Sequence, residues 1–345
     1  MRHPMKKASA EKPSEAVAAR RRHPPQWPSY RGTSQFVGTS PSGKVTVYVD
    51  PRLGHSGLQN AQDLVNDADR VVAANDKLFG KPGGPVNVII FALDGQTDGS
   101  GGADHMGCDY QTGAAIEVCA SFGNSARVAA LFEAELSECS MNGNLCGLST
   151  GEALSRWCAA VIGNNALADF ATAPQWYQDG EPDYVNQTDP TDQNADSTGC
   201  GMAFLSWLMS QGHGLDLIAQ EMVSLGDAGT LAQLYASLTG DAESAAWSKF
   251  KAAVDALPNG VTDDDPFGGG VQVAHLAHLA PATVELAGKL FAAILADIAA
   301  GKEAYQIVAS ARSVLAATPG MASLAASGGG GCSTKSRRLR PPDQT

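Results

Sequence analysis

The hydrophobic pattern of this chain changes its period once, and that change limits the possible folds more than any other feature. Up to about residue 122 the apolar stretches are short and rich in β-branched residues, as in VNVIIF (86–91), which favours strands. From residue 125 onward, apolar residues recur at the spacing of amphipathic helices. One helix interrupts the first part, over 58–79, where Gly80 is placed to end it. This order predicts an α+β fold, in which a small β-sheet with a helix is followed by a mostly helical half.

The same pattern divides the chain into segments. Strands are expected at 44–50, 86–91 and 114–122, and the Gly/Asp-rich stretch before the third strand is expected to be a loop. Helices are expected at 58–79, 125–141 and 151–162 and then repeatedly between 199 and 256. We therefore expect a disordered basic segment (1–43), a folded domain (44–257), a linker (258–274), a helical hairpin (275–320) and a flexible basic tail (321–345).

Charge is strongly segregated along the chain, although the whole carries a formal net charge of −12. Residues 1–44 hold nine Lys/Arg against two acids, whereas residues 45–266 hold eight against thirty. An acidic body repels the phosphate backbone, so we expect no nucleic-acid partner. No apolar stretch reaches the roughly 18–20 residues that a membrane-spanning helix needs, so no membrane partner is expected either.

The cysteines and the N-terminus point to different compartments. Six of the seven cysteines lie between residues 108 and 200, and such a clustered even set is typical of disulfides formed outside the reducing cytoplasm. Cys139–Cys146 is one candidate pair, and six buried thiols in a reduced protein is the alternative. The N-terminus has a basic start without an apolar core, so no signal peptide is recognised and a cytoplasmic location is expected if the start is correct.

The segment LFEAELSECS (131–140) holds three glutamates that are not equivalent on a helix. At 3.6 residues per turn, Glu135 falls in the middle of an apolar stripe, Glu138 at its edge and Glu133 on the opposite, solvent-facing side. A carboxylate on an apolar stripe needs a proton, a hydrogen-bond donor or a cation. Glu135 is therefore either a buried residue paired with Arg127 or Arg156, or part of a working site.

The next helix begins with a Ser149-x-x-Glu152 spacing, which fits a capping box. In that arrangement Ser149 is the N-cap and Glu152 is the third helical residue, whose side chain returns to the N-cap backbone. The apolar stripe of this helix, which includes Leu154 and Trp157, lies on the other side. This interpretation gives Glu152 a structural role without chemistry.

The order of these segments resembles the zincin metallopeptidases, most closely the basic secretory protein family, over about 44–257. AAIEVCASF stands where those proteins have the strand before their H-E-x-x-H helix, and AELSECSM (134–141) stands where that motif falls. GEALSRWCAAVI resembles the helix that carries the third, glutamate ligand. The segments STGCGMAFLSWLMSQG and LYASLTGDAESAAWSKFKAAV resemble the closing helices.

The resemblance implies a role for each position of the motif. Glu135 takes the place of the general base, Glu152 takes the place of the third ligand, and Arg156 stands where the family tends to have an acid. The two histidines are replaced by Ala134 and Glu138. Since zinc prefers imidazole and thiolate and catalytic sites usually supply three protein ligands, ordinary zinc peptidase chemistry is not expected.

Two interpretations of the site remain open. In one, Glu138 and Glu152, with His105 or Asp109 from the Gly/Asp-rich loop, hold one divalent cation of unassigned identity in an oxygen-rich site, and Glu135 is the catalytic base. That protein would be an atypical metallopeptidase-like hydrolase acting on a peptide or protein. In the other, the metal is lost, an Arg156–carboxylate bridge neutralises the site, and the fold serves as a non-catalytic binding or structural module.

Overall fold

The fold is α+β, as the sequence predicts, with five strands in one sheet and eight α-helices among the described residues. The structure, a computed structural model, describes residues 25–92, 97, 101–111, 115–268, 293, 296 and 300. Residues 25–268 belong to one compact unit. The expected helical hairpin (275–320), apart from three isolated residues, and the expected tail (321–345) lie outside the described residues.

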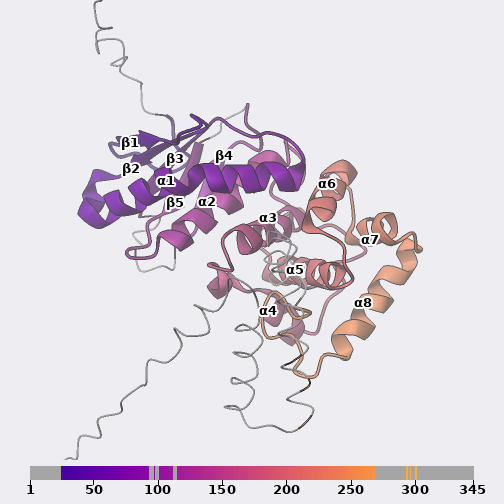
Figure 1. Cartoon of the computed structure of the whole chain (residues 1–345). Coiled ribbons are helices and arrows are strands. Elements are labelled where there is room, and N and C mark those ends of the chain that lie inside the picture. Colours follow the sequence, from indigo (N-terminus) through magenta and orange to yellow (C-terminus); the bar gives the residue numbers. More distant parts are fainter. Residues whose placement is uncertain are drawn as a thin grey trace, which may run out of the picture. The chain divides into compact units, whose positions relative to one another are not determined.

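The sheet has the strand order β1-β2-β3-β5-β4, and its two outer strands are antiparallel to their neighbours (Figure 1). The central strands β2, β3 and β5 run parallel to one another. The strands are β1 (Gln35–Thr39), β2 (Val45–Val49), β3 (Val86–Phe91), β4 (Ala103–Met106) and β5 (Ala115–Cys119). Three of these were expected, and β1 and β4 were not.

Helices α1 (Gly54–Phe79) and α2 (Ser125–Ser140) cover one face of the sheet. Helix α1 ends at Gly80, whose φ of 65° is a left-handed conformation that glycine adopts without strain. Asn124 is the N-cap of helix α2, and its side chain accepts a hydrogen bond from the Arg127 backbone N–H. Val45, Val88 and Val118 of the sheet are buried against the two helices, so the parallel strands place α2 beside the end of β5.

The opposite face of the sheet is covered by the chain before β1, which corrects the expected disorder of residues 1–43. Trp27 and Tyr30 are buried there against Tyr48 and other sheet residues. They are held by Glu117 of β5, a fully buried carboxylate that accepts hydrogen bonds from Ser29 N (2.9 Å), Ser29 Oγ (2.6 Å) and Tyr30 N (2.6 Å). Ordered structure therefore extends from residue 25 to β1, and the domain begins before residue 44.

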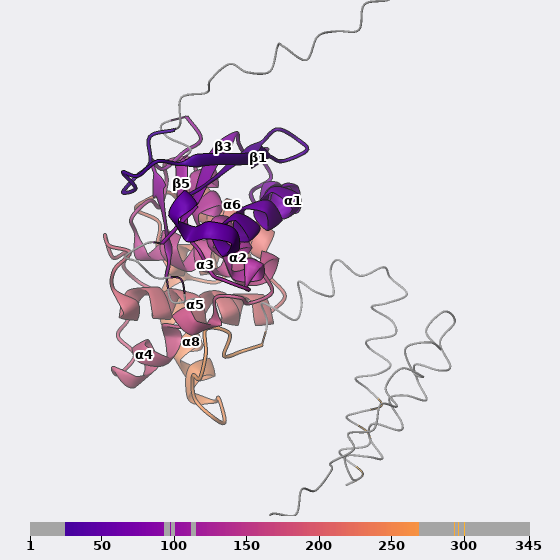
Figure 2. The same ribbon diagram turned by 90° about the vertical axis from the view of Figure 1, so that its left-hand side faces the viewer.

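The helical half follows α2 (Figure 2). Its buried side chains form a second hydrophobic core. Its helices are α3 (Ser149–Ile162), α4 (Ala173–Gln178), α5 (Ala195–Ser210), α6 (Leu215–Leu225), α7 (Leu231–Thr239) and α8 (Ala246–Asp255). Helix α5 is buried along most of its length, with Phe204 and Trp207 among the aromatic residues that pack around Phe250. No helix of the described chain is long and apolar enough to cross a membrane.

The expected linker is also incorrect for the described residues 258–268. Val261 is buried in the core of the helical half. The Asp264 carboxylate accepts hydrogen bonds from the backbone N–H groups of Thr172 (2.9 Å) and Ala173 (2.8 Å), at the start of α4. The Asp265 carboxylate accepts one from Ser206 of α5 (2.6 Å). This segment is therefore part of the folded unit.

Glu133 is the largest departure from the helical pattern. It was expected at the surface, yet its side chain is fully buried and neither carboxyl oxygen has a hydrogen-bond partner among the described residues. Burial raises the pKa of Glu133 well above its ordinary value, and the positive charge of Arg70 opposes that rise. Helix α2 packs against α1, α3, β4 and β5, so it has little solvent-facing surface and Glu133 points inward.

We predict that Glu133→Met stabilises the protein. An unpaired buried polar group costs about 1–3 kcal/mol, and methionine fills a similar volume without polar oxygens. Because the folded state raises the pKa of Glu133, the native state loses stability as pH rises above the ordinary value of 4.5. The gain measured by urea denaturation should therefore be at least as large at pH 8 as at pH 5.

The matched control is Glu243→Met, at an exposed glutamate in the short turn before α8. That substitution should change the free energy of unfolding by less than about 0.5 kcal/mol. A loss of stability in Glu133→Met would mean that the native carboxyl group has a favourable partner, and it would contradict the prediction.

Candidate metal centre

A cavity of about 590 Å³ lies where β4, α2 and α3 meet. Its lining includes all four residues that the sequence singles out, His105, Glu135, Glu138 and Glu152. Asp109, the other candidate from the loop, does not line it, and its carboxylate accepts a hydrogen bond from Gln111 N (2.7 Å). The cavity therefore gathers residues from three separate elements of the fold.

His105 lies on β4, the four-residue edge strand inside the segment that was expected to be a loop. Its Nε2 is 2.8 Å from Glu138 Oε2, and its Nδ1 is hydrogen-bonded to the carbonyl oxygen of Gly107. Burial disfavours the charged imidazole, but the hydrogen bond and the negative charge of Glu138 outweigh burial, so the pKa of His105 is raised. Both ring nitrogens are thus engaged, and the ring orientation is fixed.

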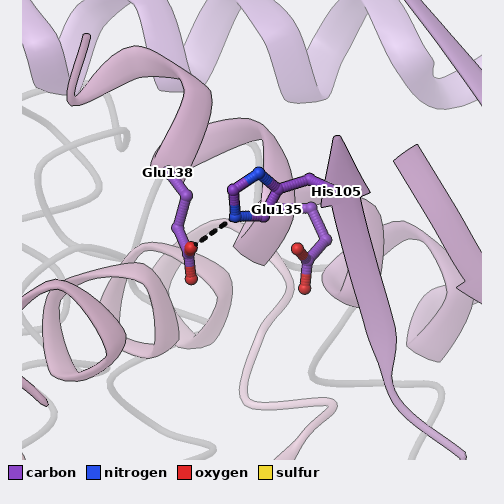
Figure 3. Close-up of side chains that lie close together, drawn as sticks. All are labelled: His105, Glu135 and Glu138. Carbon is purple, nitrogen blue, oxygen red and sulfur yellow. Dashed lines mark hydrogen bonds and ion pairs between the residues drawn. The ribbon is translucent and has the colours of Figure 1, made fainter. Parts of the chain in front are cut away.

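Glu135 and Glu138 are three residues apart on α2, so their side chains leave the same face of the helix. His105 extends toward them from the neighbouring strand, and the three side chains converge (Figure 3). One potential ligand atom from each residue lies within 4.8 Å of the others. Three groups that close could contact a single cation.

Glu152 reaches the same cavity from the first turn of α3, which corrects the expected capping box. The helix is preceded by Leu148, no side chain caps it, and Ser149 is its buried first residue. Burial raises the pKa of Glu152 to about 7, and the charge of Glu138 adds to the rise. The Glu152 side chain therefore faces the cavity and does not cap the N-terminus of α3.

Glu135 has no hydrogen bond or ion pair within the described part of the chain. Burial raises its pKa well above the ordinary value, with further contributions from the charges of Glu138 and Glu152. Both expected arginine partners are engaged elsewhere, since Arg127 pairs with Asp169. Arg156 pairs with Asp264 at 3.1 Å, so the expected bridge from Arg156 to a carboxylate of the site is not observed.

The donor set fits a divalent cation with mixed nitrogen and oxygen preference. A histidine that ligates a metal usually donates its other ring N–H to a carbonyl or carboxylate, and Gly107 provides such a carbonyl for Nδ1 of His105. That tautomer leaves the Nε2 lone pair facing Glu138. Glu135 and Glu152 add carboxylate oxygens around the same cavity. A cation would favour their charged forms and so oppose the pKa rise that burial and, to a lesser extent, mutual repulsion cause.

The rest of the cavity wall mixes apolar and polar side chains. Leu131, Leu167 and Phe170 contribute apolar surface, and Asp104, Asp192 and Arg156 bring further charged groups to the lining. The cavity thus has room for more than an ion and offers apolar as well as charged surface.

The disulfide differs from the expected pair. Cys108 is bonded to Cys146, and Cys139 is a buried free thiol. Cys108 comes three residues after His105, so the disulfide lies close to the site in sequence. Sequence spacing could not choose it, because six cysteines allow fifteen pairings.

Comparison with known proteins adds little to this description. No known protein family matches the sequence, and no curated protein matches it either. Among solved structures, the chain is similar to a yeast LTA4 hydrolase in complex with Bestatin, with a TM-score of 0.35 and 10% sequence identity. The match covers 66% of this chain and 38% of that chain. A TM-score of this size does not establish a common fold.

We predict that Glu152→Gln stabilises the protein in a chelating buffer, and only at higher pH. A carboxyl group with a folded-state pKa of about 7 instead of 4.5 favours the folded state below pH 4.5 and loses that advantage as pH rises to 7. At about 1.4 kcal/mol per pKa unit, the removed penalty is up to about 3 kcal/mol. Urea denaturation should show almost no gain at pH 4.5 and the full gain at pH 8.

The control is Asp192→Asn, at an exposed acid on the rim of the same cavity. It should change the free energy of unfolding by less than about 0.5 kcal/mol at either pH. An equal effect of Glu152→Gln at both pH values would contradict the raised pKa.

Proposed function

We propose that this protein is an atypical metallopeptidase-like hydrolase that uses one divalent cation. His105, Glu138 and Glu152 would hold the cation, and Glu135 would be the general base. The observation that carries this proposal is the convergence of His105 Nε2 with the carboxylates of Glu135 and Glu138 within 4.8 Å, in a cavity that Glu152 also lines. The nearby apolar wall gives a peptide substrate a surface to contact.

The arrangement supports a zincin-like site in which the imidazole ligand comes from a strand and not from the motif helix. Helix α2 lies beside the sheet with Glu135 and Glu138 toward the cavity, and α3 presents a glutamate from its first turn. Ala134, at the position of the first motif histidine, lines the cavity and has no ligand atom. We propose that His105, which reaches the same cavity from the edge strand β4, supplies the imidazole that Ala134 lacks.

The residues divide the chemistry between them. A divalent cation bound here would supply Lewis acidity, polarising a carbonyl oxygen and making water more acidic. The Gly107 carbonyl orients the His105 ring through Nδ1. A cation at Nε2 would replace the present hydrogen bond between Nε2 and Glu138, and both groups would then face the cation. Glu135, which makes no hydrogen bond within the described chain, would accept a proton from water once a bound cation favours its charged form. Without a cation, burial and the charges of Glu138 and Glu152 raise the pKa of Glu135 well above its ordinary value.

The second candidate function is a non-catalytic binding or structural module. A specific contact favours it: when His105 is protonated, its ring donates to both Gly107 O and Glu138, and the imidazolium partly neutralises the acidic cavity without any cation. The raised pKa of His105 is in line with that arrangement. The two functions therefore differ in whether Nε2 of His105 holds a proton or a cation.

We predict that the purified protein binds one Zn²⁺ or Mn²⁺ per chain and that Glu138→Gln and His105→Ala each weaken this binding at least about tenfold. Glu135→Gln should keep the cation but lower hydrolysis of labelled casein by about 10²-fold or more, because it removes the general base. Elemental analysis after dialysis and a fluorescence assay measure the two effects.

Glu243→Gln, at an exposed acid of the helical half, serves as the control and should alter neither quantity. If no chain retains Zn²⁺ or Mn²⁺, or if Glu135→Gln hydrolyses casein as fast as the unmodified protein, the hydrolase proposal is wrong. A protein that binds no cation and whose His105 is protonated at neutral pH would match the non-catalytic module.

A further inference from the structure

We infer that the Cys108–Cys146 disulfide is a redox-sensitive positioning element for the cation site, and that its reduction lowers cation affinity. This inference rests on the proposed function, because it concerns the regulation of the same site. The evidence for the inference is the position of the disulfide relative to the three elements that carry His105, Glu138 and Glu152.

At its Cys108 end, the disulfide fixes the segment that carries His105. Gly107, whose carbonyl oxygen is bonded to Nδ1 of His105, directly precedes Cys108. The Cys108 carbonyl oxygen accepts a hydrogen bond from Gly143 N at 2.7 Å. The backbone that orients the imidazole is thus tied to the connection between α2 and α3 by a covalent bond and a hydrogen bond.

The other cysteine of the disulfide, Cys146, lies in the connection between α2 and α3. The connection begins where α2 ends at Ser140, two residues after Glu138, and it leads into α3, whose first turn holds Glu152. It is also attached to the helical half, since Leu145 N donates to the Asp227 carboxylate at 2.6 Å. One crosslink therefore joins the strand with the histidine to the junction of the two helices with the glutamates.

The histidine strand needs such support because β4 is short and lies at an edge. Among the described strands, only β5 pairs with β4, through the register Ala103↔Val118 to Met106↔Ala115. A metal site loses affinity when a ligand moves by more than about 0.5 Å, and groups that only orient a ligand are worth about 10–100-fold in affinity. The disulfide holds the end of β4 that follows His105.

Both cysteines are partly exposed, so a reductant can reach them. A dithiol reductant attacks the disulfide, transfers two electrons and two protons in total, and closes its own disulfide, leaving two thiols at Cys108 and Cys146. Reduction leaves the Gly143–Cys108 backbone hydrogen bond and the hydrogen bonds of the Tyr110 hydroxyl with Leu136 and Ser140 to hold this segment against α2 and the connection after it. Reduced protein should keep its core, which other residues form, but hold His105 less firmly.

The test compares Zn²⁺ affinity in the full chain by competition with a fluorescent chelator. The variants are unmodified protein, the double substitution Cys108→Ser/Cys146→Ser, and Cys200→Ala as the control. Cys200 is a fully buried cysteine in α5 that does not line the cavity. Unmodified protein is also measured after reduction by a dithiol that is then removed without oxygen, which gives the reduced form even if the double variant does not fold.

We expect the double variant and the reduced protein to bind Zn²⁺ about 10-fold more weakly or worse, with an unchanged far-ultraviolet circular dichroism spectrum. Cys200→Ala should lower the melting temperature but leave affinity unchanged. If unmodified protein binds Zn²⁺ and the reduced form binds it within twofold, the positioning role is wrong and the proposed function stands. If unmodified protein binds no Zn²⁺, the positioning role and the proposed function are both wrong.

Discussion

The electrostatic repulsion among Glu135, Glu138 and Glu152 is the constraint on which the site depends. Three carboxyl groups share one cavity, and His105 is the only basic group hydrogen-bonded to any of them among the described residues. Burial and mutual charge raise the pKa values of Glu135 and Glu152. Such a cluster can exist as neutral acids, around an imidazolium, or around a metal ion. The proposed function follows from the third state, and the alternative module from the second.

The fold creates this repulsion by bringing three elements to one place. The parallel strands β3 and β5 set α2 beside the sheet, the antiparallel edge strand β4 returns next to α2, and the connection after α2 turns α3 toward the same cavity. The Cys108–Cys146 bond joins the last two of these features. A site of this kind is costly to the apo protein, so its ligand residues oppose stability while the framework around them supplies it.

The sequence predicts the element order and the unusual position of Glu135 on the inward side of α2, because both depend on local periodicity. It fails where tertiary packing decides. Glu133 is buried since α2 is enclosed by its neighbours, so one apolar stripe does not describe its environment. Strand β4 has four residues without an alternating pattern, and only pairing with β5 defines it.

Glu117 lies in an apolar run, and its partners Ser29 and Tyr30 are too distant in sequence to be recognised. The spacing of Ser149 and Glu152 fits a capping box, but the Glu152 side chain lines the cavity and does not cap the helix.

The central claim is that His105 on the edge strand supplies the imidazole nitrogen to a cation that glutamates otherwise surround. Electron spin echo envelope modulation of the Mn²⁺-loaded protein tests it most directly, because the method detects a nitrogen bonded to the metal. The account predicts modulation from one imidazole nitrogen, and its disappearance in His105→Ala at Mn²⁺ concentrations that still load the site. Mn²⁺ bound with no nitrogen signal in the unmodified protein, or a signal that survives in His105→Ala, would contradict it.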